Sequence, residues 1–175
     1  MNKIKALVLM TVFIDIVGVG VIIPVLPYYI KSFGTSDVVV TLLVAVFALL
    51  SFVSAPMLGT LSDKIGRRPV LIGSIISTSI GWLIFAWAPS VIWLFIGRII
   101  DGLAAGNITT AQSSMADISP DDKTRASNMG LIGALFGIGF IVGPVIGGLL
   151  GSIGPTVPFW FVGILAGINA ILAYF

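Results

Sequence analysis

The sequence predicts an all-α polytopic membrane protein with six transmembrane helices. Of its 175 residues, 58% are hydrophobic and only 9% are charged, whereas a soluble domain is about half apolar and a quarter charged. The apolar residues occur in runs near the ~20 residues that a helix needs to cross a bilayer. These continuous runs differ from the weakly alternating strands of about ten residues that build a membrane barrel.

Short polar or proline-containing loops separate the apolar runs, which together form a single domain over residues 1–175. The first run follows a basic N-terminus like that of a signal peptide, but it is too long, contains Asp15 and lacks a small-residue cleavage site, so we expect it to be retained. The predicted spans are Ala6–Ile30, Val38–Leu58, Pro69–Ala88, Val91–Ala111, Ser127–Leu150 and Val157–Phe175.

The basic residues outside the spans are unevenly distributed and set the orientation. Lys31 stands alone on one side, and Arg98 lies inside a span. Because Lys and Arg gather in cytoplasmic loops, we expect both termini to be cytoplasmic in a multi-pass protein of the cell membrane, meaning a plasma or inner membrane. The residues on the cytoplasmic side are Lys3, Lys5, Lys64, Arg67, Arg68, Lys123 and Arg125.

The composition also excludes several function classes. The chain has no Cys, no His and no Glu, so disulfides, zinc sites and His-based catalysis lose their usual residues. The net charge is only +2, which gives no reason to expect a nucleic acid partner. We therefore predict that the protein is not an enzyme and uses no metal or cofactor.

An isolated carboxylate, Asp15, lies in the first half of the first span. A charge at the bilayer centre costs at least about 2.5–3.5 kcal/mol, so intramembrane carboxylates are functional candidates. The alternative is a structural acid that bonds to neighbouring helices. Pro24 and Pro27 predict a kink at the far end of this span.

The fourth span has the most polar face. Arg98 and Asp101 are three residues apart and thus neighbours on a helix. At about 100° per residue, Thr109 and Gln112 fall on the same face, whereas Asn107 points away. Either the charged pair neutralises itself, or Arg98 lines a cavity where it contacts substrate or acts on a carboxylate.

A charged loop joins the second and third spans, and its charges must lie outside the hydrocarbon. Two glycines let the backbone turn there, which predicts a tight cytoplasmic hinge. An ordinary basic loop is the alternative. The pattern resembles the loop 2–3 signature of the major facilitator superfamily, G-x-L-x-D-x-x-G-R-[RK], through residues Gly59, Leu61, Asp63, Gly66, Arg67 and Arg68.

The fifth span carries a ladder of glycines at four-residue intervals. Such spacing lets helix backbones approach closely, and taken alone it predicts only tight packing. The order G-x-x-x-G-P-x-x-G-G resembles the signature of the exporter branch of the same superfamily. The residues that carry it are Gly139, Gly143, Pro144, Gly147 and Gly148.

Two further stretches strengthen the resemblance. The first span looks like that of drug:proton antiporters of the tetracycline-efflux type. The run that begins at Arg98 resembles the R-x-x-x-G motif of the fourth span, although Asp101 stands where the family more often has a neutral residue. The resemblance covers essentially the whole chain, but it matches only the N-terminal half of a twelve-span transporter.

The resemblance implies proton-coupled efflux of a small lipophilic or cationic compound by alternating access. Asp15 would be the prime proton carrier and Asp101 the second. In the family, the loop 2–3 acid caps a helix of the other half while the adjacent Arg pairs with an acid of its own half. That implies Asp63 near the partner's Ser127, and an Arg67–Asp117 pair.

A second six-helix unit would be needed, because the halves of this superfamily are parallel repeats related by an axis along the membrane normal. Either a homodimer supplies it, or a C-terminal half is missing. The partners would then be a small-molecule substrate, protons and the lipid bilayer. The alternative is a non-transporting membrane module that folds and assembles without a complete pathway.

Overall fold

The computed structural model describes residues 3–174, which fold into seven α-helices without a strand. Taken with α4 and α5 as one span, six segments are long and apolar enough to cross a membrane. All six predicted spans are therefore present; Phe175, the predicted end of the last one, lies outside the described residues. The helices are α1 (Lys3–Lys31), α2 (Asp37–Ile65), α3 (Arg67–Trp87), α4 (Val91–Leu103), α5 (Asn107–Asp117), α6 (Asp122–Ile153) and α7 (Val157–Tyr174).

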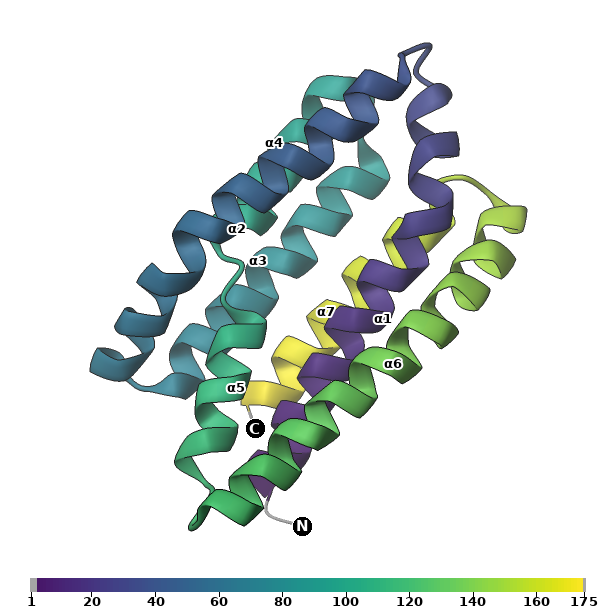
Figure 1. Ribbon diagram of the computed structural model, residues 1–175. Coiled ribbons are helices and arrows are strands. Elements are labelled where there is room, and N and C mark those ends of the chain that lie inside the picture. Colours follow the sequence, from purple (N-terminus) through teal and green to yellow (C-terminus); the bar gives the residue numbers. More distant parts are fainter. Residues whose placement is uncertain (1–2, 175) are drawn as a thin grey trace.

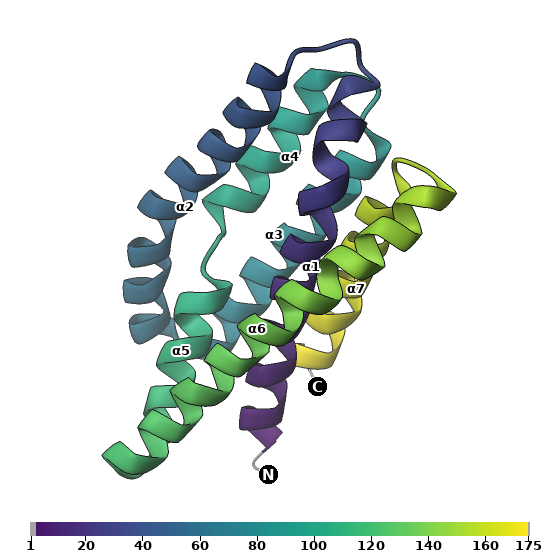
Figure 2. The same ribbon diagram turned by 45° about the vertical axis from the view of Figure 1, so that its right-hand side comes forward.

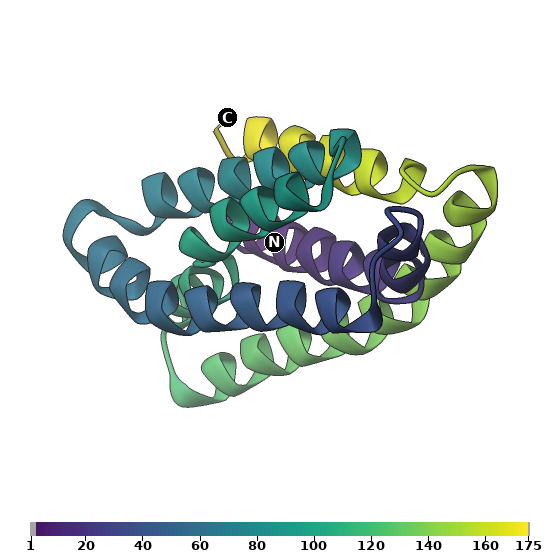
Figure 3. The ribbon, with the colours of Figure 1, turned by 90° about the horizontal axis from the view of Figure 1, so that it is seen from above.

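The six spans run roughly alongside one another, with α1 near the centre of the bundle (Figure 1). Seen from above, α3 and α7 lie along one side, and α2 and α6 along the opposite side (Figure 3). α1 packs most extensively against α6, and α3 against α7. The last turns of α1, which hold Pro24 and Pro27, bend away from the axis of the preceding turns (Figure 1).

An aromatic cluster fills the core between α1, α3 and α7. The Tyr29 ring lies 4.7 Å from the Phe159 ring and 5.8 Å from the Phe85 ring, measured between centroids. The Tyr29 hydroxyl donates a hydrogen bond to the Phe85 carbonyl oxygen at 2.9 Å. Since a buried hydroxyl without a partner is costly, this bond lets the tyrosine lie in an otherwise apolar core.

Glycines bring α1 and α6 into backbone contact. A Cβ atom added to Gly143 would lie 2.6 Å from the Gly20 Cα, and one added to Gly147 would collide with the Val21 carbonyl oxygen. A Cβ on Gly139 would lie 2.6 Å from the Ile16 side chain. Lipid supplies little hydrophobic drive for helix association, so close packing of this kind holds membrane helices together. The glycine ladder thus serves contact within the chain.

The fourth span is broken, which the sequence did not lead us to expect. α4 ends at Leu103 and α5 begins at Asn107, and the segment that links them is irregular backbone (Figure 2). Gly102 and Gly106 flank the break, and glycine weakens a helix interior by roughly 1 kcal/mol relative to alanine. The prediction of one continuous helix over Val91–Ala111 was wrong at this point.

A polar side chain of the α5–α6 loop caps the start of α6. The Asp121 carboxylate accepts a hydrogen bond from the Thr124 backbone N–H at 2.7 Å and is the N-cap of α6. This bond lowers the pKa of Asp121, because it favours the charged form. α6 therefore begins at Asp122, five residues before Ser127, which is the predicted start of the fifth span.

Candidate functional site

A cavity of about 440 Å³ opens beside the break in the fourth span. Side chains of α1, α2, α3, α4, α5 and α7 line it, and most of them are apolar. Its polar residues come from five different segments and meet at mid-span. They are Asp15, Ser51, Thr78, Arg98, Asp101, Asn107 and Thr109.

Arg98 and Asp101 form a buried charge pair in the wall of this cavity. The Arg98 Nη1 lies 3.7 Å from the Asp101 Oδ2, and both side chains are less than one-tenth exposed. The Arg98 guanidinium carbon also lies 4.2 Å from the centre of the Trp82 ring, a cation–π contact that stabilises a desolvated cation. The Arg98 Nε is buried and has no hydrogen-bond partner within residues 3–174, so the pair is incompletely satisfied and has capacity for a further polar group.

Asp15 reaches the same cavity from α1. Its Oδ1 is buried and has no hydrogen-bond partner among the described residues. Asn107 and Thr78 line the same cavity, and the Asn107 Nδ2 donates to the Thr78 Oγ1 at 3.3 Å. Polar side chains of α1, α3, α4 and α5 therefore share this cavity with the two carboxyl groups.

The broken helix leaves carbonyl groups that serine hydroxyls satisfy. The Ser77 Oγ of α3 donates to the Ile100 oxygen at 2.7 Å, and the Ser54 Oγ of α2 donates to the Gly102 oxygen at 2.7 Å. Irregular backbone at membrane depth is tolerated where it is buried in protein or lines a cavity. These two hydrogen bonds stabilise the irregular backbone at the break.

The placement of the predicted residues follows from the break. Asp15, Arg98, Asp101 and Thr109 line the cavity together, whereas Gln112 is exposed and is not among its lining residues. The prediction that Asn107 points away was wrong: it lines the cavity. The angle between residues was counted along a continuous helix, and the irregular segment resets that angle. The small residues around Gly102 and Gly106, directly before a polar Asn107, are the signal that could have revealed it.

The charged loop between α2 and α3 forms a second cluster, separate from the cavity. The Arg67 Nη1 lies 2.5 Å from the Asp63 Oδ1, and its Nε lies 2.9 Å from the Asp117 Oδ2 at the end of α5. The same Nη1 donates to the Ser62 Oγ at 2.7 Å. The predicted pairing of Arg67 with Asp117 is confirmed, and Asp63 joins it from the same chain.

The other members of the predicted motifs are distributed between buried and exposed positions. Gly66 has a φ of +100°, a backbone conformation that residues other than glycine rarely adopt, so it makes the turn between α2 and α3. Arg68 bonds the last carbonyls of α7. Gly59 and Gly148 face open space, in contrast to the buried glycines of α6.

Comparison with known proteins shows which family and which relatives this chain is similar to. The sequence profile of the Major Facilitator Superfamily matches residues 8–175. The tetracycline resistance protein, class C, of Escherichia coli is 41% identical over 178 residues, covering 99% of this chain and 44% of that protein. The quinolone resistance protein NorA of Staphylococcus aureus is 36% identical over 166 residues, covering 94% of this chain and 42% of that protein.

A solved structure shares the fold. The crystal structure of the human organic anion transporter MFSD10 (TETRAN) aligns with a TM-score of 0.85 at 22% identity, over 99% of this chain and 46% of that one. The chain thus spans less than half the length of the relatives that it matches.

Proposed function

The chain belongs to the Major Facilitator Superfamily, and from that membership we propose that it forms one six-helix unit of a transporter that exports small lipophilic or cationic compounds in exchange for protons. The observation that carries the proposal is the buried cavity with two carboxyl groups and one guanidinium in an otherwise apolar bundle. The names of its relatives, which include tetracycline and quinolone resistance proteins, support a drug-like substrate.

Asp15 is the group that we assign to proton exchange. It lies in a low-dielectric setting with one unpartnered oxygen, and protonation removes the charge that this setting disfavours. Asp101 is already paired with Arg98, so it is the second candidate. A cationic substrate that approaches Asp15 would compete with a proton for the same carboxylate, and such competition is sufficient to couple the two fluxes.

Arg98 and the aromatic residues around it form the wall against which a substrate would be held. The guanidinium is fixed between Trp82 at 4.2 Å and Phe47 at 5.2 Å from the ring centres. An aromatic ring system bound here gains contact with flat apolar surfaces, and a polar substituent gains the Arg98 Nε that lacks a partner. This combination suits amphiphilic compounds rather than sugars or inorganic ions.

Transport requires a second six-helix unit, and we propose that it covers the side of the bundle occupied by α2 and α6. These two spans are the least covered by the rest of the bundle. Only 11% and 17% of the residues in the 18-residue apolar stretch of each span are buried. Alternating access would then follow from rocking of the two units around the cavity. The loop cluster of Arg67, Asp63 and Asp117 would hold the side that faces the cytoplasm closed, in a cell membrane with both termini cytoplasmic.

A reconstituted transport assay tests this function. Vesicles containing the chain should accumulate tetracycline or the lipophilic cation ethidium when a proton gradient is imposed. Asp15→Asn should abolish the gradient-driven part and retain the folded state. Asp37→Asn is the matched control, because Asp37 is exposed and pairs with Lys31 at 3.1 Å outside the cavity. A folded chain that moves neither compound would refute transport by this chain alone and favour a non-transporting module.

A further inference from the structure

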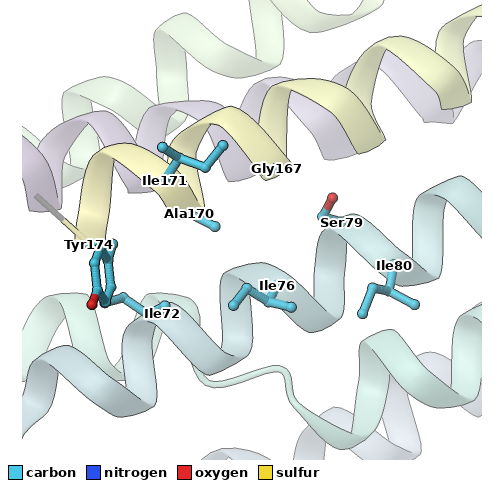
Figure 4. Close-up of a pocket in the computed structure, with 8 residues that line it drawn as sticks. All are labelled: Ile72, Ile76, Ser79, Ile80, Gly167, Ala170, Ile171 and Tyr174. Atoms are coloured by element: carbon cyan, nitrogen blue, oxygen red, sulfur yellow. The ribbon is translucent and has the colours of Figure 1, made fainter.

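A second hollow lies between α3 and α7 (Figure 4), and it shares no lining residue with the cavity. Its volume is about 400 Å³. Ile72, Ile76 and Ile80 of α3 form one wall, and residues of α7, including Ile171 and Tyr174, form the other. Ile76, Ile80 and Ile171 are 45%, 44% and 60% exposed, so the groove opens toward the lipid that surrounds a membrane protein.

The floor of this groove offers hydrocarbon contact. The Ser79 hydroxyl donates to the Gly163 carbonyl oxygen at 2.7 Å and is therefore already satisfied by α7. Gly167 contributes no side chain, and a Cβ placed there would lie 3.1 Å from the Ser79 Oγ. The absence of that side chain keeps the floor hollow. A groove of this composition favours an aliphatic chain over a polar solute.

Arg68 stands at one end of the groove. Residues 68, 72, 76 and 80 follow at four-residue intervals, so Arg68 continues the ridge that the three isoleucines form along α3. Its Nε donates to the Ala173 oxygen at 3.1 Å and its Nη2 to the Tyr174 oxygen, which fixes the guanidinium beside the groove. A guanidinium has five N–H donors, and within residues 3–174 Arg68 uses two of them, so its exposed side chain has further donors to offer an anion.

The length of the groove matches one leaflet of a bilayer. At a rise of 1.5 Å per residue, Ile80 lies about 12 Å from Ile72 and about 18 Å from Arg68 along the helix axis. Half of the hydrocarbon core is about 15 Å thick. With Arg68 at the interface beside the Gly66 loop, the groove therefore extends from the headgroup level to the middle of the bilayer.

We propose that this groove binds one acyl chain of an anionic phospholipid, whose phosphate is held by Arg68. The site is distinct from the cavity and does not depend on transport. Lys64 lies four residues before Arg68, and basic residues at the membrane surface attract anionic headgroups. The choline cation of a zwitterionic lipid would instead be placed near like charges.

Photo-crosslinking with an acyl-chain diazirine phosphatidylglycerol tests the site, using the full chain in phosphatidylcholine nanodiscs. The expected adducts lie on α3 between residues 72 and 80 and on α7 between residues 167 and 174. Unlabelled phosphatidylglycerol should displace the probe at about a fifth of the mole fraction that added phosphatidylcholine requires, the factor expected for one basic residue at an anionic headgroup. Equal displacement by the two lipids would overturn the proposal.

Two variants separate the acyl chain from the headgroup. Ile76→Trp fills the groove from an exposed position and should remove most adducts, whereas the matched control Ile141→Trp, at a 71% exposed position of α6, should leave them unchanged. Arg68→Gln should abolish the preference for phosphatidylglycerol, and Arg68→Lys should retain part of it. Adducts that persist in Ile76→Trp, or that spread evenly over the lipid-facing helices, would contradict a specific groove.

Discussion

The Nε of Arg67 lies 2.9 Å from the Oδ2 of Asp117, although fifty residues separate them in sequence. The contact ties the start of α3 to the end of α5. Asp63 and Ser62 approach the same guanidinium from the end of α2. One side chain thus gathers three helix ends, so the loop cluster fixes how α2, α3 and α5 lie relative to one another at this end of the bundle.

We predict that Asp117→Asn changes conformation more than stability. The Asp117 side chain is 56% exposed, and exposed ion pairs contribute about 0–1 kcal/mol, so the thermal midpoint should shift little. Ser62 is 1% exposed behind Arg67. The chain has no native cysteine, so Ser62→Cys supplies a single reporter, and its labelling rate should rise when Asp117→Asn is added. The comparison uses Ser62→Cys in both backgrounds, because Ser62 itself accepts a bond from Arg67. Asp122→Asn is the control, and a rate equal to that control would remove the clamp role of Arg67.

Two adjacent glycines of α6 should respond in opposite ways to the same substitution. A Cβ on Gly147 collides with the Val21 backbone, whereas one on Gly148 meets nothing within 4 Å. Gly147→Ala should therefore lower the free energy of unfolding by about 1–3 kcal/mol through overpacking. Gly148→Ala should be neutral or stabilising by up to about 1 kcal/mol, because alanine is the better helix former. Unfolding in mixed detergent measures both, and equal effects would contradict the packing of α1 on α6.

Asn107 and Thr78 should be energetically coupled. Their hydrogen bond measures 3.3 Å and links α5 to α3 beside the break. A double-mutant cycle with Asn107→Ala and Thr78→Val should give a coupling of about 0.6 kcal/mol, the average for such bonds in membranes. The control cycle replaces Thr78→Val by Ser79→Ala, because Ser79 bonds Gly163 instead. Coupling of equal size in both cycles would show that the effect is not specific to the contact.

Hydrophobicity was sufficient to predict the six spans, whereas part of the site depended on local backbone geometry. Each apolar run became a span, because length and composition alone decide whether a segment can cross a bilayer. The shared position of Arg98 and Asp101 on the cavity wall follows from their three-residue spacing on α4, whereas Asp15 reaches it from α1. Asn107 was misplaced because the break at residues 104–106 depends on carbonyl partners, Ser54 and Ser77, that come from other helices. Residue spacing along the fourth span cannot reveal hydrogen-bond partners that other helices supply.

The glycines of α6 are a second case in which the sequence predicts a contact but not the helix that makes it. Their spacing predicts close packing but not the partner, and two faces of one helix carry glycines. Gly139, Gly143 and Gly147 contact α1, while Gly130, Gly133 and Gly137 have nothing within 4 Å of an added Cβ. The first set serves the fold of this unit. The second set lies on the open side of the bundle, together with the exposed residues of α2.

This open face leads to the last prediction, which concerns the second six-helix unit. Within residues 3–174, α2 and α6 do not pack extensively against each other, and both leave large apolar side chains exposed, such as Phe52 at 79% and Ile141 at 71%. If a second copy of this chain supplies the other unit, α2 of one protomer should cross α6 of its partner. Symmetry then repeats the contact. Dispersion between small residues would stabilise it, since lipid offers little hydrophobic drive.

Cysteine cross-linking in nanodiscs measures this contact. One cysteine replaces a residue between Ser51 and Ala55 on α2, and the other replaces a residue between Gly133 and Gly137 on α6. These pairs should produce a dimer band, because both positions lie on the open side. The matched control pairs the same α2 cysteine with Gly147→Cys, which faces α1 and should give no band. Links confined to one chain, or a monomer throughout, would refute the homodimer. A different six-helix unit would then have to cover the open side.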